Sequence, residues 1–289
     1  MNNKTVGVIG AGTIGSGVAQ DLAQNGIKTI VVDVSQAALD TARNKIRQNI
    51  RLYKLYNKTK PIGNADEIME LLTFTTDYKE LEEASFVIEN ITENWEAKKE
   101  VYKRIDEICP ENTMFAVNSS CISITRVGSV TKRPSQILGM HFMNPVPIKP
   151  VVEVIRGFHT SAETIKAAEE LLKHMQKEAI IINDMPGFVS NRLMTFMINE
   201  AAFLVQEQVA AVEDIDRLIK TSYGHKMGPL ETADLIGVDT ILYSMEVLYE
   251  SFNDSKFRPC PLLKKMVDAG QLGRKSGKGF YTYSKELIY

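Results

Sequence analysis

The sequence contains little cysteine, and its cysteines are poorly placed for pairing. Only three occur among 289 residues, Cys109, Cys121 and Cys260, an odd number at wide spacings. This pattern fits neither a disulfide framework nor the paired spacings of a zinc site. It excludes a disulfide-rich secreted scaffold, favours a reducing compartment and gives no reason to expect a bound metal.

Long apolar runs and an excess of charge of one sign are also missing. No uninterrupted apolar stretch approaches the roughly 20 residues that a membrane helix needs. The amino terminus, MNNKTVGVIGAG, lacks the zones of a secretory signal. The formal net charge of -2 gives no overall attraction to nucleic acid or to an anionic membrane. We therefore expect a cytoplasmic protein whose partners include neither nucleic acid nor a membrane.

Short apolar runs that alternate with helix-like stretches are abundant. Runs at residues 5–10, 28–33, 71–76, 84–89, 113–120, 136–143 and 151–155 have the length of buried strands. Stretches such as 13–26, 94–109 and 160–178 have helical character, and the first ends at Gly26 as a helix should. The alternation predicts an α/β fold with a Rossmann-type, mostly parallel sheet covered on both faces.

The pattern changes at Asp184-Met185-Pro186-Gly187. Strand signals end there, and residues 188–210, 213–224 and 239–252 have the pattern of long apolar helices. Helices this apolar need partners to cover them. We expect a sheet domain over residues 1–185, followed by an all-helical domain over 186–289 whose apolar surface is partly buried in a homodimer.

A glycine-rich turn follows the first predicted strand and matches G-x-G-x-x-G. The first glycine permits a tight turn, the second lets a pyrophosphate approach the backbone, and the third allows close packing of helix on strand. Asp33 ends the second predicted strand, where its carboxylate can bond ribose hydroxyls and repel a 2′-phosphate. The pattern predicts NAD rather than NADP, with a plain tight turn or a flavin site as the alternatives. The predicted contacts are Gly10, Gly12, Thr13, Ile14, Gly15 and Asp33.

His141 lies beside apolar residues in HFMNPVP, where a lone histidine is more often a hydrogen-bonded core residue than a catalyst. Glu153 lies 12 residues later in the apolar segment VVEVI, and a buried carboxylate needs a partner. If the intervening segment folds back, Glu153 can hold one imidazole nitrogen and leave the other to move a proton. The pair is our candidate for acid–base chemistry.

Seven segments together resemble one family, the L-3-hydroxyacyl-CoA dehydrogenases, and most closely the bacterial 3-hydroxybutyryl-CoA dehydrogenases. In family order they are VGVIGAGTIGSGVAQ, ENITENWEAKK, NSSCISIT, GMHFMNPVPIKPVVEVI, DMPGFVSNRL, MGPLETADLIGVD and GRKSGKGFYTY. The resemblance covers nearly the whole chain. It implies that residues 1–185 form the NAD-binding domain and that the helical domain, residues 186–289, contributes to substrate binding and dimerisation. It implies an NAD-dependent oxidoreductase of fatty acid metabolism that interconverts an L-3-hydroxyacyl-CoA and a 3-ketoacyl-CoA, with 3-hydroxybutyryl-CoA and acetoacetyl-CoA as the expected pair.

The resemblance also implies roles for single residues. His141 resembles the family's catalytic base, Glu153 the carboxylate that orients it, and Ser120 and Asn191 the groups that bind the reacting oxygen. Further cofactor contacts implied in the same way are Glu93, Lys98, Ser120, Asn144 and Lys275. The alternatives are that Ser120 and Asn191 cap helices and that Lys275 is merely solvated.

The segment TARNKIRQNIRLYKLYNKTKP resembles the family's helical hairpin. Its basic residues include Lys45, Arg47, Arg51, Lys54, Lys58 and Lys60. Such a face can receive the 3′-phosphate-ADP of coenzyme A, with Arg51 and Lys54 as candidates, although a charge run is usually a solvated helix face. Rival interpretations are a dehydrogenase for a substrate carried on acyl carrier protein or for a sugar acid, and a non-catalytic nucleotide-binding protein. Cys121 is given no catalytic role.

Overall fold

The computed structural model describes residues 5–56, 64–120 and 122–283, except for the side chains of residues 52–56. Cys121, Lys58 and Lys60 lie outside these ranges, and Lys54 is described by its backbone alone. The chain divides into two compact units, Met1–Met185 and Pro186–Tyr289.

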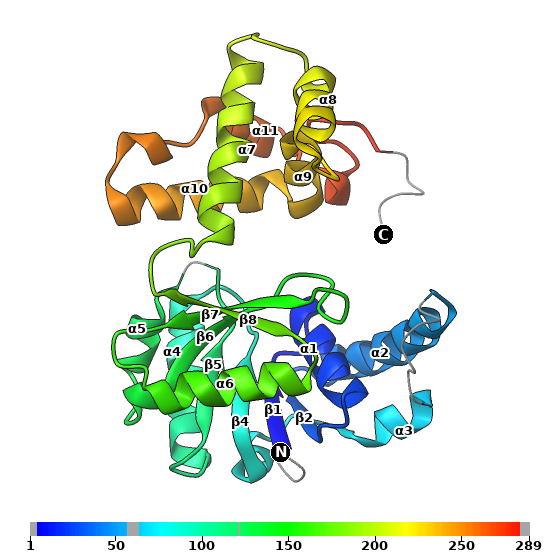
Figure 1. Cartoon of the computed structure of the whole chain (residues 1–289), viewed down its shortest axis with the longest axis vertical. Coiled ribbons are helices and arrows are strands. Elements are labelled where there is room, and N and C mark those ends of the chain that lie inside the picture. The colour runs from blue at the N-terminus through cyan, green and yellow to red at the C-terminus, as the bar shows by residue number, and fades with distance from the viewer. Residues whose placement is uncertain (1–4, 57–63, 121, 284–289) are drawn as a thin grey trace. The chain divides into compact units, whose positions relative to one another are not determined.

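A single twisted sheet forms the centre of the first unit (Figure 1). In the described residues it has eight strands in the order β3-β2-β1-β4-β5-β6-β7-β8. Every neighbouring pair is parallel except β6 and β7. The strands are β1 (Thr5–Ile9), β2 (Thr29–Val32), β3 (Leu72–Thr75), β4 (Ala84–Glu89), β5 (Met114–Val117), β6 (Ile137–His141), β7 (Val151–Arg156) and β8 (Glu178–Asn183).

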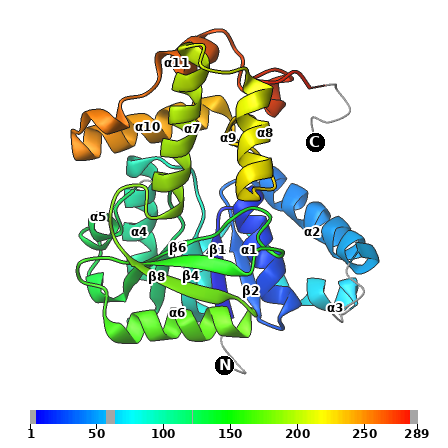
Figure 2. The same cartoon turned by 45° about the horizontal axis from the view of Figure 1, so that its top comes forward.

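Helices cover both faces of this sheet, which explains why its central strands are continuous apolar runs. Figure 2 shows α1 and α6 packed along the strands, and α2 completes the same layer through Ile46. On the opposite face, Tyr102 of α4 contacts Phe115 of β5 edge to face. The helices are α1 (Thr13–Gln24), α2 (Gln36–Tyr56), α3 (Ala65–Glu70), α4 (Trp95–Ile108), α5 (Ile124–Gly128) and α6 (Ala162–His174), with 3-10 turns η1 (Tyr78–Glu83) and η2 (Pro134–Gln136).

In the described sheet, β6 and β7 are the one antiparallel pair of neighbours. Parallel neighbours need a long crossover, whereas antiparallel strands can be joined by a short connection. Residues 142–150 make that connection, and the resulting register places His141 directly opposite Glu153.

The edge strand β8 is an element that the sequence did not predict. The helix expected over residues 160–178 ends earlier, at His174, and Gln176 has a positive φ of 57°. The strand that follows is covered incompletely, since Ile180 and Ile181 are 46% and 40% exposed. Its run of isoleucines lacks the alternation of a half-buried strand, and it follows the helix too closely for its pattern to stand apart.

The second unit is helical. Within residues 186–283 it contains isolated bridges but no strand. Its core brings Ile198 of α7, Ile241 of α10 and Leu263 of α11 together. The elements are α7 (Ser190–Gln206), α8 (Val212–Tyr223), α9 (Pro229–Ile236), α10 (Val238–Phe252), η3 (Ser255–Phe257), α11 (Pro261–Asp268) and η4 (Arg274–Ser276).

A buried carboxylate fixes the last described segment to this helical unit. Asp234 of α9 accepts hydrogen bonds from the backbone N–H groups of Phe280 and Tyr281 and from the Tyr283 hydroxyl. Burial raises the pKa of Asp234 above its ordinary value. No helix in the described ranges is both long and apolar enough to cross a membrane. The predicted α/β sheet domain followed by a helical domain is confirmed.

Candidate active site

Polar residues gather where the parallel strands end. The carboxyl ends of neighbouring parallel strands lie at one edge of a sheet, and loops that leave this edge commonly form binding sites. The loop after β4 carries Glu93, the loop after β5 carries Ser120, and His141 is the last residue of β6. Hydrogen bonds tie these three segments together.

A chain of three side chains runs through this edge. Glu153 Oε2 lies 2.7 Å from Nδ1 of His141, and Nε2 of the same ring lies 3.1 Å from Ser120 Oγ. His141 and Glu153 are only 6% and 7% exposed. An ionised carboxylate can only accept, so Nδ1 carries the hydrogen toward Glu153. In the neutral ring Nε2 is then the acceptor, placed to take a proton beside the Ser120 hydroxyl.

Glu93 supports the loop that carries Ser120. Its Oε1 atom accepts hydrogen bonds from Ser119 Oγ at 2.5 Å, from the Ser120 N–H at 3.1 Å and from the Ile122 N–H at 3.2 Å. A carboxylate that gathers three donors fixes the backbone around them. The cofactor contact that the resemblance implies for Glu93 stays a prediction.

Lys98 is buried at the same edge of the sheet. Its side chain is 0% exposed, and Nζ lies 2.7 and 2.8 Å from the two carboxylate oxygens of Glu89 and 3.3 Å from the Asn118 carbonyl. Burial raises the pKa of Glu89, against the opposing effect of the Lys98 ammonium. The pair joins the ends of β4 and β5, and any cofactor contact of Lys98 stays a prediction.

Sequence reasoning missed Glu89 and the two asparagines beside it. Asn118 Nδ2 donates to Asn90 Oδ1 at 2.8 Å, and Asn118 Oδ1 accepts from the Phe142 N–H at 3.3 Å. These bonds link the loops after β4, β5 and β6. The available signal was a carboxylate that closes the apolar strand ASFVIE, where an unpaired charge is costly.

The helix-cap alternatives for Ser120 and Asn191 do not hold. The residue that caps α5 is Ser123, whose hydroxyl accepts from the Arg126 N–H. The cap position of α7 is occupied by Val189 and has no side-chain hydrogen bond. Asn191 is the second residue of α7, half-buried, and belongs to the second unit. Its contact with a reacting oxygen stays a prediction.

The glycine-rich turn exposes backbone where a diphosphate would need it. A Cβ atom added at Gly12 would meet nothing within 4 Å, whereas one at Gly15 would lie 1.9 Å from the Gly10 carbonyl oxygen. Gly10 itself has a φ of +94°. The turn is therefore tightly packed at Gly15 and open at Gly12, so that a pyrophosphate could approach its backbone.

Asp33 closes this site on the side of β2. Its Oδ2 accepts from the Ala11 N–H at 2.8 Å and its Oδ1 from the Ser35 N–H at 2.9 Å. A carboxylate oxygen has two lone pairs, so both atoms can also accept from ribose hydroxyls. Thr13 begins α1 and is exposed, whereas Ile14 is half-buried against the core. A hollow of about 400 Å³ adjoins the turn and is lined by Gly12, Thr13, Ser16 and residues of α2 that include Lys45.

Comparison with known proteins assigns both units. Residues 5–185 match the family model described as 3-hydroxyacyl-CoA dehydrogenase, NAD binding domain, and residues 187–283 match its C-terminal domain. The chain belongs to the 3-hydroxyacyl-CoA dehydrogenase family. The resemblance predicted from the sequence is therefore confirmed, and the cofactor of this NAD-binding domain is NAD.

Individual relatives are similar over almost the whole length. The chain is 44% identical over 286 residues to the probable 3-hydroxybutyryl-CoA dehydrogenase of Bacillus subtilis, covering 99% of each chain. It is 43% identical to the 3-hydroxybutyryl-CoA dehydrogenase of Clostridioides difficile, over 96% of this chain and 99% of that one. The crystal structure of (S)-3-hydroxybutyryl-CoA dehydrogenase PaaH1 from Ralstonia eutropha has 43% identity and a TM-score of 0.93, and the match covers 98% of this chain and 99% of that one.

The remaining predicted site residues of this 3-hydroxyacyl-CoA dehydrogenase are less constrained. Asn144 is exposed in the connection between β6 and β7. Lys275 lies on η4 in the second unit, where its ammonium pairs with Asp239 at 2.6 Å. Arg51 is exposed on α2, a helix of 21 residues that is followed by α3. Their contacts with NAD or coenzyme A stay predictions.

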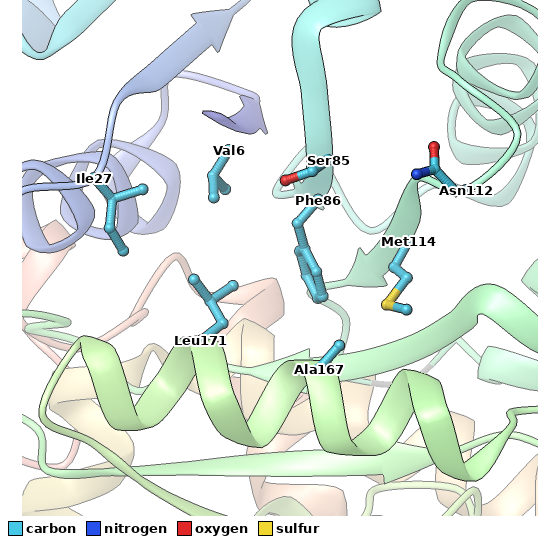
Figure 3. A pocket seen from close by; sticks show the side chains of 8 residues that line it. All are labelled: Val6, Ile27, Ser85, Phe86, Asn112, Met114, Ala167 and Leu171. Carbon is cyan, nitrogen blue, oxygen red and sulfur yellow. The ribbon is translucent and has the colours of Figure 1, made fainter. Parts of the chain in front are cut away.

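A separate cavity of about 120 Å³ lies at the other end of the strands (Figure 3). Val6, Phe86 and Met114 approach it from the amino-terminal parts of β1, β4 and β5, and Leu171 approaches from α6. Because His141 ends its strand at the carboxyl edge, this cavity is not part of the candidate active site. Across the described chain, no three His, Cys, Asp or Glu side chains gather as a metal-binding set.

Proposed function

We propose that this chain interconverts an L-3-hydroxyacyl-CoA and the corresponding 3-ketoacyl-CoA with NAD(H), and that its substrates are 3-hydroxybutyryl-CoA and acetoacetyl-CoA. The observation that carries the proposal is the chain Ser120–His141–Glu153 at the carboxyl edge of the sheet. The names of the relatives from Bacillus subtilis and Clostridioides difficile support the four-carbon substrate.

The proton chemistry follows from the tautomer that Glu153 sets. Bound NAD supplies the hydride acceptor for oxidation, and NADH the donor for reduction. In oxidation, Nε2 of His141 takes the proton of the C3 hydroxyl while the C3 hydrogen leaves as hydride. Glu153 then faces an imidazolium across 2.7 Å and stabilises its charge. In reduction the imidazolium returns that proton to the oxygen as the hydride arrives.

Two neutral groups are proposed to hold the reacting oxygen. Ser120 Oγ already lies beside Nε2, and a hydroxyl there can donate to an oxygen that also contacts the ring. The Asn191 amide is proposed as the second donor, from the second unit. One preorganised donor to a developing oxyanion contributes about 2.7–4 kcal/mol to lowering a barrier.

The basic side chains of α2 are proposed to bind the nucleotide end of coenzyme A, with Arg51 and Lys54 as the contacts. In Arg51→Ala we expect the KM for acetoacetyl-CoA to rise about tenfold, because a charge-assisted hydrogen bond is worth about 1.5–3 kcal/mol. Acetoacetyl-pantetheine, which lacks the nucleotide, should show no such change. Lys166→Ala on the exposed face of α6 is the control. Equal effects on both thioesters would contradict this assignment.

Steady-state absorbance of NADH with acetoacetyl-CoA tests the function directly. We expect NADH to be oxidised at the expense of acetoacetyl-CoA and NADPH to be a poor substitute, because Asp33 would repel the 2′-phosphate. Turnover only with an acetoacetyl group on acyl carrier protein, or only with a sugar acid, would redirect the assignment. Binding of NADH without turnover of any of these would favour a non-catalytic nucleotide-binding protein.

A homodimer that forms through the helical unit is also proposed. Exposed apolar side chains of this unit include Leu193, Met194 and Phe196 on α7 and Leu235 and Ile236 on α9. Large apolar side chains left exposed on a surface are typical of subunit interfaces. We expect a mass in solution of about twice 32.3 kDa by light scattering; a monomeric mass at assay concentration would refute it.

A cytoplasmic location is proposed because Cys109 and Cys260 are free thiols.

A further inference from the structure

Lys177 is a buried cation whose ammonium lies beside residues 142–150, the connection between β6 and β7. Its side chain is 3% exposed. Nζ lies 2.9 Å from Asp21 Oδ2 on α1, and it donates to the Val146 carbonyl at 2.7 Å and to the Lys149 carbonyl at 2.6 Å. The ammonium thus donates to two carbonyl oxygens, and the Asp21 carboxylate lies at ion-pair distance from it.

The carbonyls that Lys177 binds belong to the segment that joins His141 to Glu153. Residues 142–150 turn the chain from β6 into β7 and carry Asn144, for which a cofactor contact is predicted. The neighbouring Glu178 N–H donates to the Pro150 carbonyl at 2.8 Å. Residues 177 and 178 therefore hold the second half of this connection by three of its carbonyls.

The same segment packs closely on the helix that begins at the glycine-rich turn. A Cβ atom added at Gly17 of α1 would lie 3.1 Å from Cβ of Val146, and Val146 is buried. Asp21 lies on the same helix, one turn further on, and is buried as well. The ammonium thus links the connection to α1, the helix that begins at the glycine-rich turn.

A buried ammonium such as that of Lys177 destabilises the fold unless its carboxylate and carbonyl partners are all present. Removing an ion from water costs several kcal/mol, and loss of one partner leaves the other charge buried without compensation. An apolar side chain at this place could be buried with a smaller loss of free energy than an ammonium. A buried ammonium with directed N–H groups does what an apolar side chain does not, since it fixes the positions of two carbonyl oxygens.

We infer that Lys177 is a positioning residue for the dehydrogenase reaction: it sets the place of residues 142–150, and so of Asn144 and the His141–Glu153 pair, relative to α1, with Asp21 as its charge partner. This inference rests on the proposed function. Since a misplacement of about 1 Å can cost on the order of 10²-fold in rate, loss of the carbonyl bonds should slow the chemical step.

Three variants separate positioning from stability. Lys177→Met removes the donors and leaves Asp21 uncompensated, Asp21→Asn removes the charge but leaves the carbonyl bonds in place, and the double variant removes both charges. Lys166→Met, at an exposed position on α6, is the control. Each variant is assayed for thermal midpoint, kcat, KM for acetoacetyl-CoA, and the isotope effect on kcat with NADH deuterated at the transferred hydrogen.

We expect both single variants to unfold at lower temperature and the double variant to recover most of that loss. Only the two variants that lack Lys177 should lose kcat, by roughly 10- to 100-fold, with little change in KM. Their isotope effect should rise, because hydride transfer becomes rate-limiting. A smaller folded fraction alone would lower kcat without changing the isotope effect. If Lys177→Met does not fold, the double variant carries the test.

Two results would overturn the inference. One is a double variant with kcat within about threefold of the parent, or with a lower kcat and an unchanged isotope effect. The other is an equal loss of kcat in Asp21→Asn, which keeps the carbonyl bonds. The parent enzyme is assayed first, and failure of the parent to oxidise NADH with acetoacetyl-CoA would count against the proposed function, not against the role of Lys177.

Discussion

His141 and Glu153 meet because of strand register. Directly opposite residues of an antiparallel pair project to the same face of the sheet, and the structure aligns these two across β6 and β7. The sequence allowed this pairing only on the condition that residues 142–150 fold back. Nothing in the spacing indicated that Ser120 would lie at the other ring nitrogen, or that Glu93 would hold its loop, because such contacts depend on loop conformation.

Glu153→Gln tests the charge of this pair while keeping its shape. The glutamine carbonyl can still accept from Nδ1, so the ring should keep its orientation, but the positive charge that develops on the imidazole loses its partner. We expect kcat to fall by at least about tenfold, with NADH affinity unchanged. Glu170→Gln, at an exposed position on α6, is the matched control. A parent-like rate in Glu153→Gln would contradict the role of this carboxylate.

Cys109 should be chemically inert in the folded enzyme. Burial raises the pKa of its thiol to about 12 from 9.0. Because the thiolate is the reactive form and a raised pKa depletes it, the thiolate fraction at pH 8 falls from about one tenth to about 10⁻⁴. Alkylation of Cys109 by iodoacetamide, followed by peptide mass spectrometry, should be slow at pH 8 and become rapid on unfolding. Rapid modification of the native protein would show that the thiol is accessible and ionised.

At the scale of elements, two glycines of the glycine-rich turn have different roles: Gly12 leaves room for the cofactor, and Gly15 allows α1 to pack against the turn. Gly12→Ala places a methyl group in open space at a φ of -69° that alanine tolerates, so the fold should be unaffected while the approach of the cofactor is blocked. Gly15→Ala drives a methyl group into the Gly10 carbonyl, so it should destabilise the domain. Thermal midpoints and NADH fluorescence titrations measure the two effects. A Gly12→Ala protein with parent-like NADH affinity would refute the assignment of this turn.

The elements that the sequence predicted are those with a strong period or a clear boundary. The strands from β1 to β7 are apolar runs bounded by turn residues. The helices α1 and α4 begin and end close to the expected residues, and α6 begins close to its expected start. The misses have local causes. An exposed edge strand such as β8 lacks the alternating pattern, and short helices such as α9 and α11 offer two turns of periodicity at most.

At the scale of the whole molecule, each unit matches its own part of the same family. The resemblance of seven separate segments to this family predicted the match, because seven segments in one order are far more specific than a single glycine turn. The roles proposed for Asn191 and Lys275 require contacts between the two units. No spacing within one unit determines such contacts, so these roles remain predictions of the resemblance.

The account depends on His141 as the group that moves the proton, and one comparison tests this directly. His141→Asn keeps a donor for Glu153 but has no ring nitrogen to exchange a proton, and His174→Asn on the exposed end of α6 is its control. With saturating NADH and acetoacetyl-CoA, we predict that kcat falls by roughly 10²–10⁴-fold in His141→Asn alone, while both variants bind NADH as the parent does. Turnover of His141→Asn within a few fold of the parent would contradict the mechanism.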